Sequence, residues 1–234
     1  AMGTRYGDIK WGGPPFGTSG GRVTWSLATV TDAFTQFDAV ISGPAFQRLV
    51  RRAIDAWDDV LDLEFVEVAG DRRADVAIAF SDIDGPGGTL GVARTSFFSD
   101  GELTRAAVRM DLGEDWTTDP DFVSRRFADP INFYAVVAHE IGHAIGLEHI
   151  PVRRSLMHPT SSLATDLTLT DVRAAVALYG PETGNAGPGR QILAGTDAGD
   201  RLRAGPGRDE AHGFCGDDAL FGGAGDDRLV GHAG

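Results

Sequence analysis

The sequence predicts an α/β fold: a mixed, twisted β-sheet with a backing helix, a second helix that carries the most informative residues, and a C-terminal helix. Short β-rich segments alternate with Asp/Gly loops through the first half of the chain, and apolar residues recur at helical spacing in three stretches. A nine-residue Gly/Asp repeat follows at the end. The 234 residues, 42% of them hydrophobic, are sufficient for a substantial core.

Alternation and helical periodicity predict the first elements. A strand covers residues 22–28, after a Gly/Pro-rich extension over residues 1–21 in which Ala1–Gly3 resemble a cloning scar. A helix that starts after Gly43-Pro44 is expected to lie across the sheet with an apolar face made of Phe46, Leu49, Val50, Ala53, Ile54, Trp57 and Val60. Four further strands are predicted over residues 63–68, 75–80, 89–95 and 107–111.

The later elements divide the chain into a globular unit and a tail. A second helix opens at Phe133, and a third is predicted to start at Thr170 as its N-cap and to end before Gly180-Pro181. Beyond that point the composition shifts to Gly, Pro and Asp, which indicates a separate module. The expected boundaries are 22–181 for the globular unit, 182–194 for a linker and 195–234 for truncated repeats.

The tail repeats an acidic and an aliphatic position. Glycines allow the turns to direct carbonyl groups toward an ion, the aspartate adds charge, and the aliphatic residue two places later fills the inside of a roll. The pattern therefore predicts a calcium-binding β-roll. The aspartates are Asp200, Asp209, Asp218 and Asp227, and the aliphatic residues are Leu202, Ala211, Leu220 and Leu229.

Charge and cysteine content limit the possible partners. The net charge of −13 disfavours nucleic acid as a partner, because an acidic surface is repelled by the phosphate backbone. Cys215 is the single cysteine, so an intrachain disulfide is impossible and metal ions are the expected reinforcement. No apolar run is long enough to span a bilayer, and we expect no membrane partner.

The second helix contains a pattern typical of a catalytic zinc site. His139 and His143 are four residues apart and so lie on one helical face, with Glu140 beside them. Gly146 can adopt a left-handed conformation that ends the helix and brings His149 round as a third ligand. Three ligands leave one position for a water, whose proton Glu140 can accept. The alternative, a helix whose histidines only pack or face solvent, must explain each of these residues separately.

At HEIGHAIGLEH the sequence resembles the metzincins, and Ser155-Leu156-Met157-His158-Pro159 resembles the Met-turn of the matrixins. This resemblance covers most of residues 22–181 and implies a metzincin-type fold, with Met157 as an apolar floor beneath zinc. The tail is similar to serralysins and other RTX proteins. Serralysins carry a tyrosine at the position of Pro159, so the catalytic unit is more similar to matrixins.

The resemblance also implies a structural calcium site and a substrate pocket. The calcium would be held by side chains and carbonyl groups of two loops, and hard oxygen ligands suit that ion; a solvated Asp-Gly turn is the alternative. The implied calcium ligands are the side chains of Asp84, Asp111 and Glu114 and the carbonyl groups of Gly85, Gly87 and Thr89. His158 and Pro159 would belong to the wall of the substrate pocket, which extends over residues 158–164.

Together these observations predict a secreted zinc-dependent endopeptidase that acts on proteins or peptides, with zinc as catalytic and calcium as structural cofactor. The resemblance implies that a propeptide or a proteinaceous inhibitor, if one acts, lies outside this sequence. Two alternatives stay open. One is a calcium-dependent binding or assembly module with a catalytically silent zinc domain, against which the intact Glu140 counts. The other is a non-proteolytic zinc hydrolase.

Overall fold

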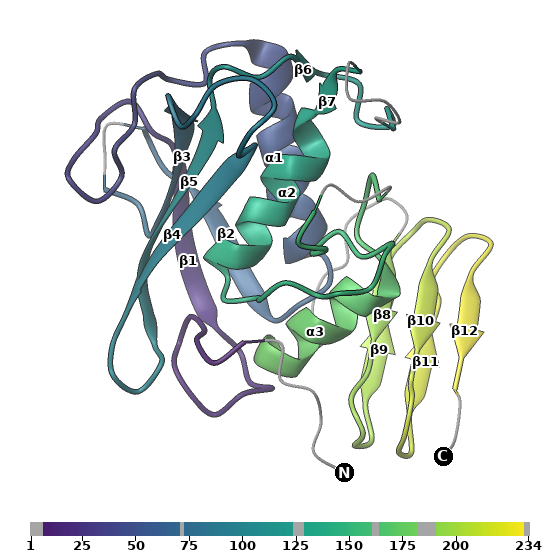
Figure 1. Cartoon of the computed structure of the whole chain (residues 1–234). Coiled ribbons are helices and arrows are strands. Elements are labelled where there is room, and N and C mark those ends of the chain that lie inside the picture. Colours follow the sequence, from purple (N-terminus) through teal and green to yellow (C-terminus); the bar gives the residue numbers. More distant parts are fainter. Residues whose placement is uncertain (1–6, 71–72, 124–128, 161–163, 182–190, 232–234) are drawn as a thin grey trace.

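The computed structural model describes residues 7–70, 73–123, 129–160, 164–181 and 191–231. Figure 1 shows a twisted sheet with two helices against one face, a third helix at one end and a small roll of short strands beside that helix. The sheet contains, in spatial order, β2 (Leu63–Glu67), β1 (Gly21–Leu27), β3 (Val76–Ser81), β5 (Leu103–Asp111) and β4 (Gly91–Phe97). Only β4 is antiparallel to its neighbour, so the predicted mixed sheet is confirmed.

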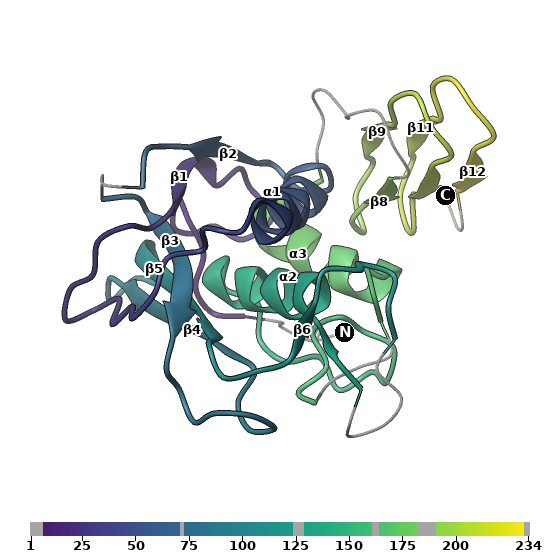
Figure 2. The same cartoon turned by 90° about the horizontal axis from the view of Figure 1, so that it is seen from above.

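Two helices cover the inner face of the sheet, as Figure 2 shows from above. They are α1 (Pro44–Asp58) and α2 (Phe133–Ala144). Proline at the first position starts α1, since its fixed φ suits the first turn. Trp57 of α1 is fully buried and donates its indole N–H to the carbonyl of Ala138 in α2 at 2.9 Å. This contact joins α1 to α2, and α2 lies against β4 and β5 at one edge of the sheet.

The third helix, α3 (Leu169–Tyr179), begins two residues earlier than expected. The prediction of Thr170 as its N-cap is wrong, because Thr168 is the cap. The Asp171 carboxylate accepts the backbone N–H of Thr168 at 2.9 Å and its hydroxyl at 2.7 Å, which completes a capping box. Two further elements, the short strands β6 (Trp116–Thr117) and β7 (Ile131–Asn132), lead into α2.

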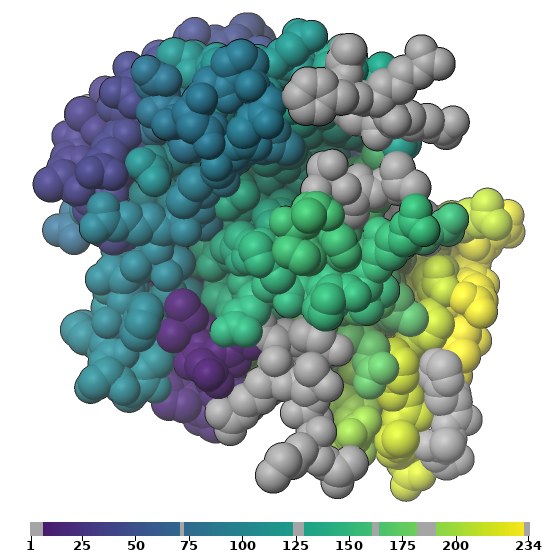
Figure 3. All heavy atoms as spheres, in the orientation of Figure 1, coloured from purple at the N-terminus to yellow at the C-terminus, as the bar shows by residue number. Residues whose placement is uncertain are grey.

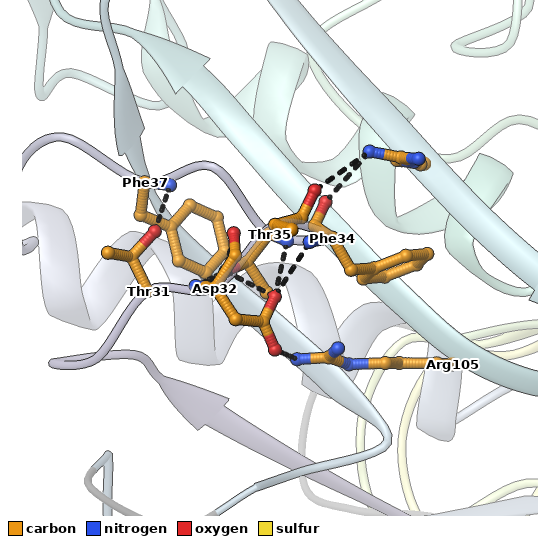
Figure 4. A network of polar contacts seen from close by, with 8 residues as sticks. Thr31, Asp32, Phe34, Thr35, Phe37 and Arg105 are labelled. Carbon is orange, nitrogen blue, oxygen red and sulfur yellow. Dashed lines mark hydrogen bonds and ion pairs between the residues drawn. The ribbon is translucent and has the colours of Figure 1, made fainter.

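A loop over residues 28–42 packs on the outer face of the sheet, and Figure 4 shows the polar contacts that hold it. Phe37 and partly buried Phe34 pack against small residues of β3 and β5. Asp32 accepts N–H groups from Phe34 and Thr35 and pairs with Arg105 at 2.7 Å. These bonds hold the pKa of Asp32 below its ordinary value, with the Arg105 hydrogen bond as the main cause. The loop therefore closes this face with aromatic rings and one half-exposed ion pair.

The tail forms a two-sided roll of parallel strands. One sheet contains β8 (Ile192–Ala194), β10 (Glu210–His212) and β12 (Arg228–Val230), and the other contains β9 (Arg201–Arg203) and β11 (Ala219–Phe221). Paired residues differ by 18 in number, 210 − 192 and 228 − 210, so each turn of the roll uses two nine-residue repeats. Leu202 and Ala211 fill the interior as predicted, whereas Leu229 is 45% exposed.

The roll packs against the globular unit, although its composition indicated a separate module. The last residues of the expected linker, 192–194, pair as β8, and its residues 182–190 lie outside the described part of the chain. Ala194 is fully buried in the main core. Phe214 adopts a φ of 70°, and its ring lies 3.9 Å from the Arg173 guanidinium of α3. No helix among the described residues is long and apolar enough to cross a membrane.

Candidate metal centre and active-site cleft

Three histidines converge at the C-terminal end of α2. His139 and His143 lie on the helix and His149 lies on the segment that follows it. One ring nitrogen from each lies within 4.8 Å of the others, and the ring centroids are 4.7–5.4 Å apart. Among the described residues this is the only group of three or more His, Cys, Asp or Glu side chains that are close enough to share an ion.

The orientation of the rings suits a zinc ion. Nδ1 of His139 lies 2.7 Å from the carbonyl oxygen of Leu156, and Nδ1 of His143 lies 2.7 Å from that of Leu147. A carbonyl accepts, so each Nδ1 carries the proton and each Nε2 offers a lone pair. Burial lowers the pKa of His139 to about 4 and also lowers that of His143, which keeps both rings neutral near pH 7. Imidazole nitrogens with a free lone pair are ligands that zinc accepts.

Glu140 lies between α2 and the edge strand of the sheet. Its side chain is 6% exposed, and a Cβ added at Gly91 of β4 would lie 2.9 Å from its Cγ. Burial raises the pKa of Glu140 to about 7, while the N–H of Ala93 acts in the opposite direction by donating to the carboxylate. A carboxyl group with a pKa near neutrality can both accept and return a proton.

The end of α2 is stabilised by aromatic donors from distant segments. The indole N–H of Trp11 donates to the carbonyl of Ala144 at 3.1 Å, and the hydroxyl of Tyr179 donates to that of Ile145 at 2.6 Å. These carbonyls have no partner within the helix. Gly146 then has a φ of 93°, and a Cβ there would lie 2.0 Å from the carbonyl oxygen of Ile9. Both constraints require glycine at the turn that leads to His149, as predicted.

A tight turn lies beneath the histidines and is held by one buried carboxylate. Met157 is fully buried, and the preceding Leu156 carbonyl is the partner of His139. Asp171 of α3 is also fully buried and accepts the N–H groups of Leu156 and Met157 at 2.9 and 3.1 Å. It also accepts the hydroxyl of Ser155. Asp171, which joins this turn to the start of α3, was not predicted from the sequence.

Gly142 provides a test of this packing. A Cβ added there would lie 2.3 Å from Sδ of Met157 and 3.1 Å from the ring of Trp57. Gly142→Ala should therefore destabilise the protein by about 1–3 kcal/mol through overpacking. Helix propensity alone would stabilise it by about 0.5–1 kcal/mol, so the sign separates the two effects. Urea unfolding measures the difference, and Gly231→Ala is the control because a Cβ added there would meet no atom within 4 Å apart from its chain neighbours.

The predicted pocket wall is described only in part. His158 is half-buried, and its Nδ1 lies 3.1 Å from the hydroxyl of Thr160, while Pro159 is exposed. Residues 161–163 of the expected wall lie outside the described residues. The hydrogen bonds of His158 are to its own turn, so its assignment to the pocket remains a prediction.

The acids of the expected calcium loop bind mainly backbone donors. Asp111 is fully buried and accepts N–H groups from residues 83–85 and 113 at 2.9–3.4 Å. Burial is the largest single effect and acts to raise the pKa of Asp111. The hydrogen bonds from the four backbone N–H groups together outweigh it, so the pKa of Asp111 is lowered. Asp84 accepts the N–H and hydroxyl of Thr89, and Glu114 accepts the N–H of Gly87. Calcium ligation by these residues remains a prediction.

The roll contains two carboxylate oxygens that suit a cation. They belong to Asp209 and Asp218, whose Oδ1 atoms already accept hydrogen bonds. Oδ1 of Asp209 accepts the N–H of Gln191 at 2.9 Å, and Oδ1 of Asp218 accepts the N–H of Asp200 at 3.0 Å. The second oxygens of Asp209 and Asp218 are buried without a hydrogen-bond partner among the described residues. Burial raises the pKa of Asp209, and neighbouring Asp227 acts in the same direction. A hard cation such as calcium satisfies such oxygens.

Asp209→Asn should change the stability of the protein differently with and without calcium. Without calcium the variant should be at least as stable as the wild type, because a buried charge is removed. With saturating calcium it should lose roughly 1–3 kcal/mol of the stabilisation that the ion gives. Thermal unfolding with and without calcium measures both. The control is Asp197→Asn at an exposed repeat position, and an equal calcium response of the two variants would contradict the prediction.

Comparison with known proteins adds two family matches. The model of the matrixin family matches residues 24–180, and that of the RTX calcium-binding nonapeptide repeat matches residues 194–229 and 216–234. The chain is 31% identical over 173 residues to matrix metalloproteinase-20 of Homo sapiens, which covers 69% of this chain and 33% of the relative. It is 30% identical over 177 residues to interstitial collagenase of Bos taurus, and this match covers 71% of the chain and 35% of the collagenase.

Matrilysin of Rattus norvegicus is 31% identical over 168 residues, and the match covers 67% of this chain and 58% of matrilysin. The chain thus spans about a third of the length of the first two relatives and somewhat more than half of the third. The matched region contains the histidine cluster, Glu140 and the turn at Met157.

Proposed function

The chain belongs to the matrixin family, and from this premise we propose that it is a zinc-dependent endopeptidase with His139, His143 and His149 as zinc ligands. The observation that carries the proposal is the position of Glu140. Its carboxylate is buried, it directly follows His139 of the histidine cluster in α2, and it lies against β4, which has only one sheet neighbour among the described strands. A peptide that pairs with this strand edge would place its backbone beside that carboxylate.

The chemistry assigns different tasks to the residues of the site. When bound, zinc supplies Lewis-acid activation of a water and of the peptide carbonyl. Glu140 accepts the proton of the attacking water at its carboxylate and returns it to the leaving amine. The carbonyls of Leu156 and Leu147 hold the rings of His139 and His143 in orientation. Met157 closes the floor of the site with an apolar side chain.

We further propose calcium as the cofactor of the roll and an extracellular location for the protein. The buried oxygens of Asp209 and Asp218 support calcium binding, and calcium reaches the concentrations that such modules need outside cells. Residues 22–181 would form the catalytic domain and the repeats would begin near β8. The substrate would be a protein or peptide.

The test is hydrolysis of a mixed, quenched peptide library, with zinc content determined on the same samples. The zinc-loaded protein should cleave, removal of zinc with a chelator should abolish cleavage, and added zinc should restore it. His149→Ala should lower both zinc content and rate. Zinc-loaded, folded protein that cleaves no peptide would overturn the proposal and favour a calcium-dependent binding or assembly role.

A further inference from the structure

A groove extends from the histidine cluster toward the hairpin that joins β4 to β5. Its volume is about 640 Å³, and its lining includes Ala93 and Phe97 of β4, Ile9, Leu147 and the metal-site residue His143. In Figure 3 the N-terminal segment, in purple, lies beside the teal chain of that hairpin. The groove therefore continues the active-site cleft along the same strand edge.

Side chains of β4 alternate between the groove and the opposite face of the sheet. Ala93, Thr95 and Phe97 line the groove. Arg94 lies between Ala93 and Thr95 in the strand. Its side chain points to the opposite face of the sheet, where its guanidinium is 5.0 Å from the ring of Phe34 on the outer loop. An extended peptide on this edge would have the same two-residue alternation, so every second side chain would enter the groove.

The described lining of the groove carries acidic side chains and no basic Lys or Arg. The acidic side chains are those of Asp8, Asp100 and Glu148. Asp100 accepts the N–H of Glu102 at 3.1 Å, which fixes its carboxylate at the hairpin. Phe97, 54% exposed, offers apolar surface close to these acids. A long side chain with an apolar stem and a cationic end matches this combination, because arginine and lysine pack their stems and keep the charge at the rim.

We propose that this groove selects an arginine or lysine in the substrate, three or four residues before the scissile bond. The inference rests on the proposed endopeptidase function. Antiparallel pairing is the more stable arrangement, and it places the amino-terminal side of the peptide over Thr95 and Phe97. Phe97 follows Ala93 by four residues, which is about 13 Å at ~3.3 Å per residue. Ala93 is the β4 residue whose N–H binds Glu140, so this distance separates the groove's far end from the reacting bond.

The test compares two peptides that differ only at that position, one with arginine and one with glutamate. The ratio of their kcat/KM values should favour arginine by roughly five- to twentyfold at low salt, and added salt should reduce it. Glu148→Gln and the double variant Asp100→Asn/Glu148→Gln should lower this ratio progressively. Glu64→Gln, the same change at an exposed residue of β2, should leave this ratio unchanged. Because the readout is a ratio, a general loss of activity does not affect it.

A ratio that stays the same in the groove variants, or that shows no preference in the wild type, overturns the proposal. If the wild type cleaves no peptide, the same two peptides are labelled and their affinities for the zinc-loaded protein are measured by fluorescence anisotropy. Tighter binding of the arginine peptide, lost in the double variant, would then support the groove while the proposed hydrolysis fails. Equal affinities would overturn the groove as well.

Discussion

Glu140→Gln is expected to reduce kcat/KM for peptide hydrolysis by about 10²–10⁴-fold while zinc stays bound. Glutamine keeps the size of the side chain and so preserves its packing against Gly91 of β4. It cannot accept a proton, which removes the base from the reaction. The three histidines are unchanged, and their orientation depends on carbonyls of other residues. Steady-state rates and zinc content on the same preparations give the measurement.

Glu64→Gln on β2 is the matched control, since it makes the same chemical change at an exposed position on the far edge of the sheet. It should retain full activity. A Glu140→Gln protein that holds zinc and works within about tenfold of the wild type would mean that another group is the base. Loss of zinc from this variant would instead show that Glu140 has a structural role at the site.

Asp171→Ala is expected to destabilise the fold by about 3–5 kcal/mol, because it leaves the buried donors of the turn and of the α3 cap without an acceptor. Ser155, Leu156, Met157 and Thr168 all donate to this carboxylate. The same change should loosen the carbonyl of Leu156 and thereby weaken zinc binding through His139. Urea unfolding and zinc affinity measure the two consequences.

Asp171→Asn keeps the volume and one acceptor oxygen, so it should cost less than alanine. Asp166→Asn is the control, because the Asp166 side chain is 51% exposed and accepts from the hydroxyl of Tyr134 and the N–H of Leu167, with an ion pair to Arg52 at 3.7 Å. That change should cost less than about 1 kcal/mol. If Asp171→Ala were no more destabilising than Asp166→Asn, the turn would have to be stabilised by its apolar packing instead.

The fold could be predicted largely because its signals are local. Strand alternation and the apolar face of residues 46–60 follow from geometry within one element, and these predictions agree with β1–β5 and α1. The histidine spacing is local as well, since residues 139 and 143 must share a helical face. Even the turn at Gly146 could be predicted, because only glycine tolerates a φ of 93° without strain.

The parts that were missed depend on contacts between elements. Thr168 and Asp171 have the spacing of a capping box, and this signal could have located the start of α3. That Asp171 also holds the turn at Met157 could not be read from spacing, because it requires the packing of two segments. The docking of Phe214 on Arg173 is equally non-local, since the repeat pattern gives no reason for an aromatic residue there.

Because the roll packs on α3 through Phe214, we expect the roll and the catalytic unit to unfold together. Ala194 belongs to the main core, and α3, which the roll contacts, also carries Asp171. Ions that bind only the folded roll therefore lower the free energy of the whole native state. Calorimetry should show one endotherm that moves upward with calcium, with equal calorimetric and van't Hoff enthalpies, whereas two peaks would indicate independent units. Calcium supply would then set the lifetime of the zinc site, even though the roll itself takes no part in the reaction.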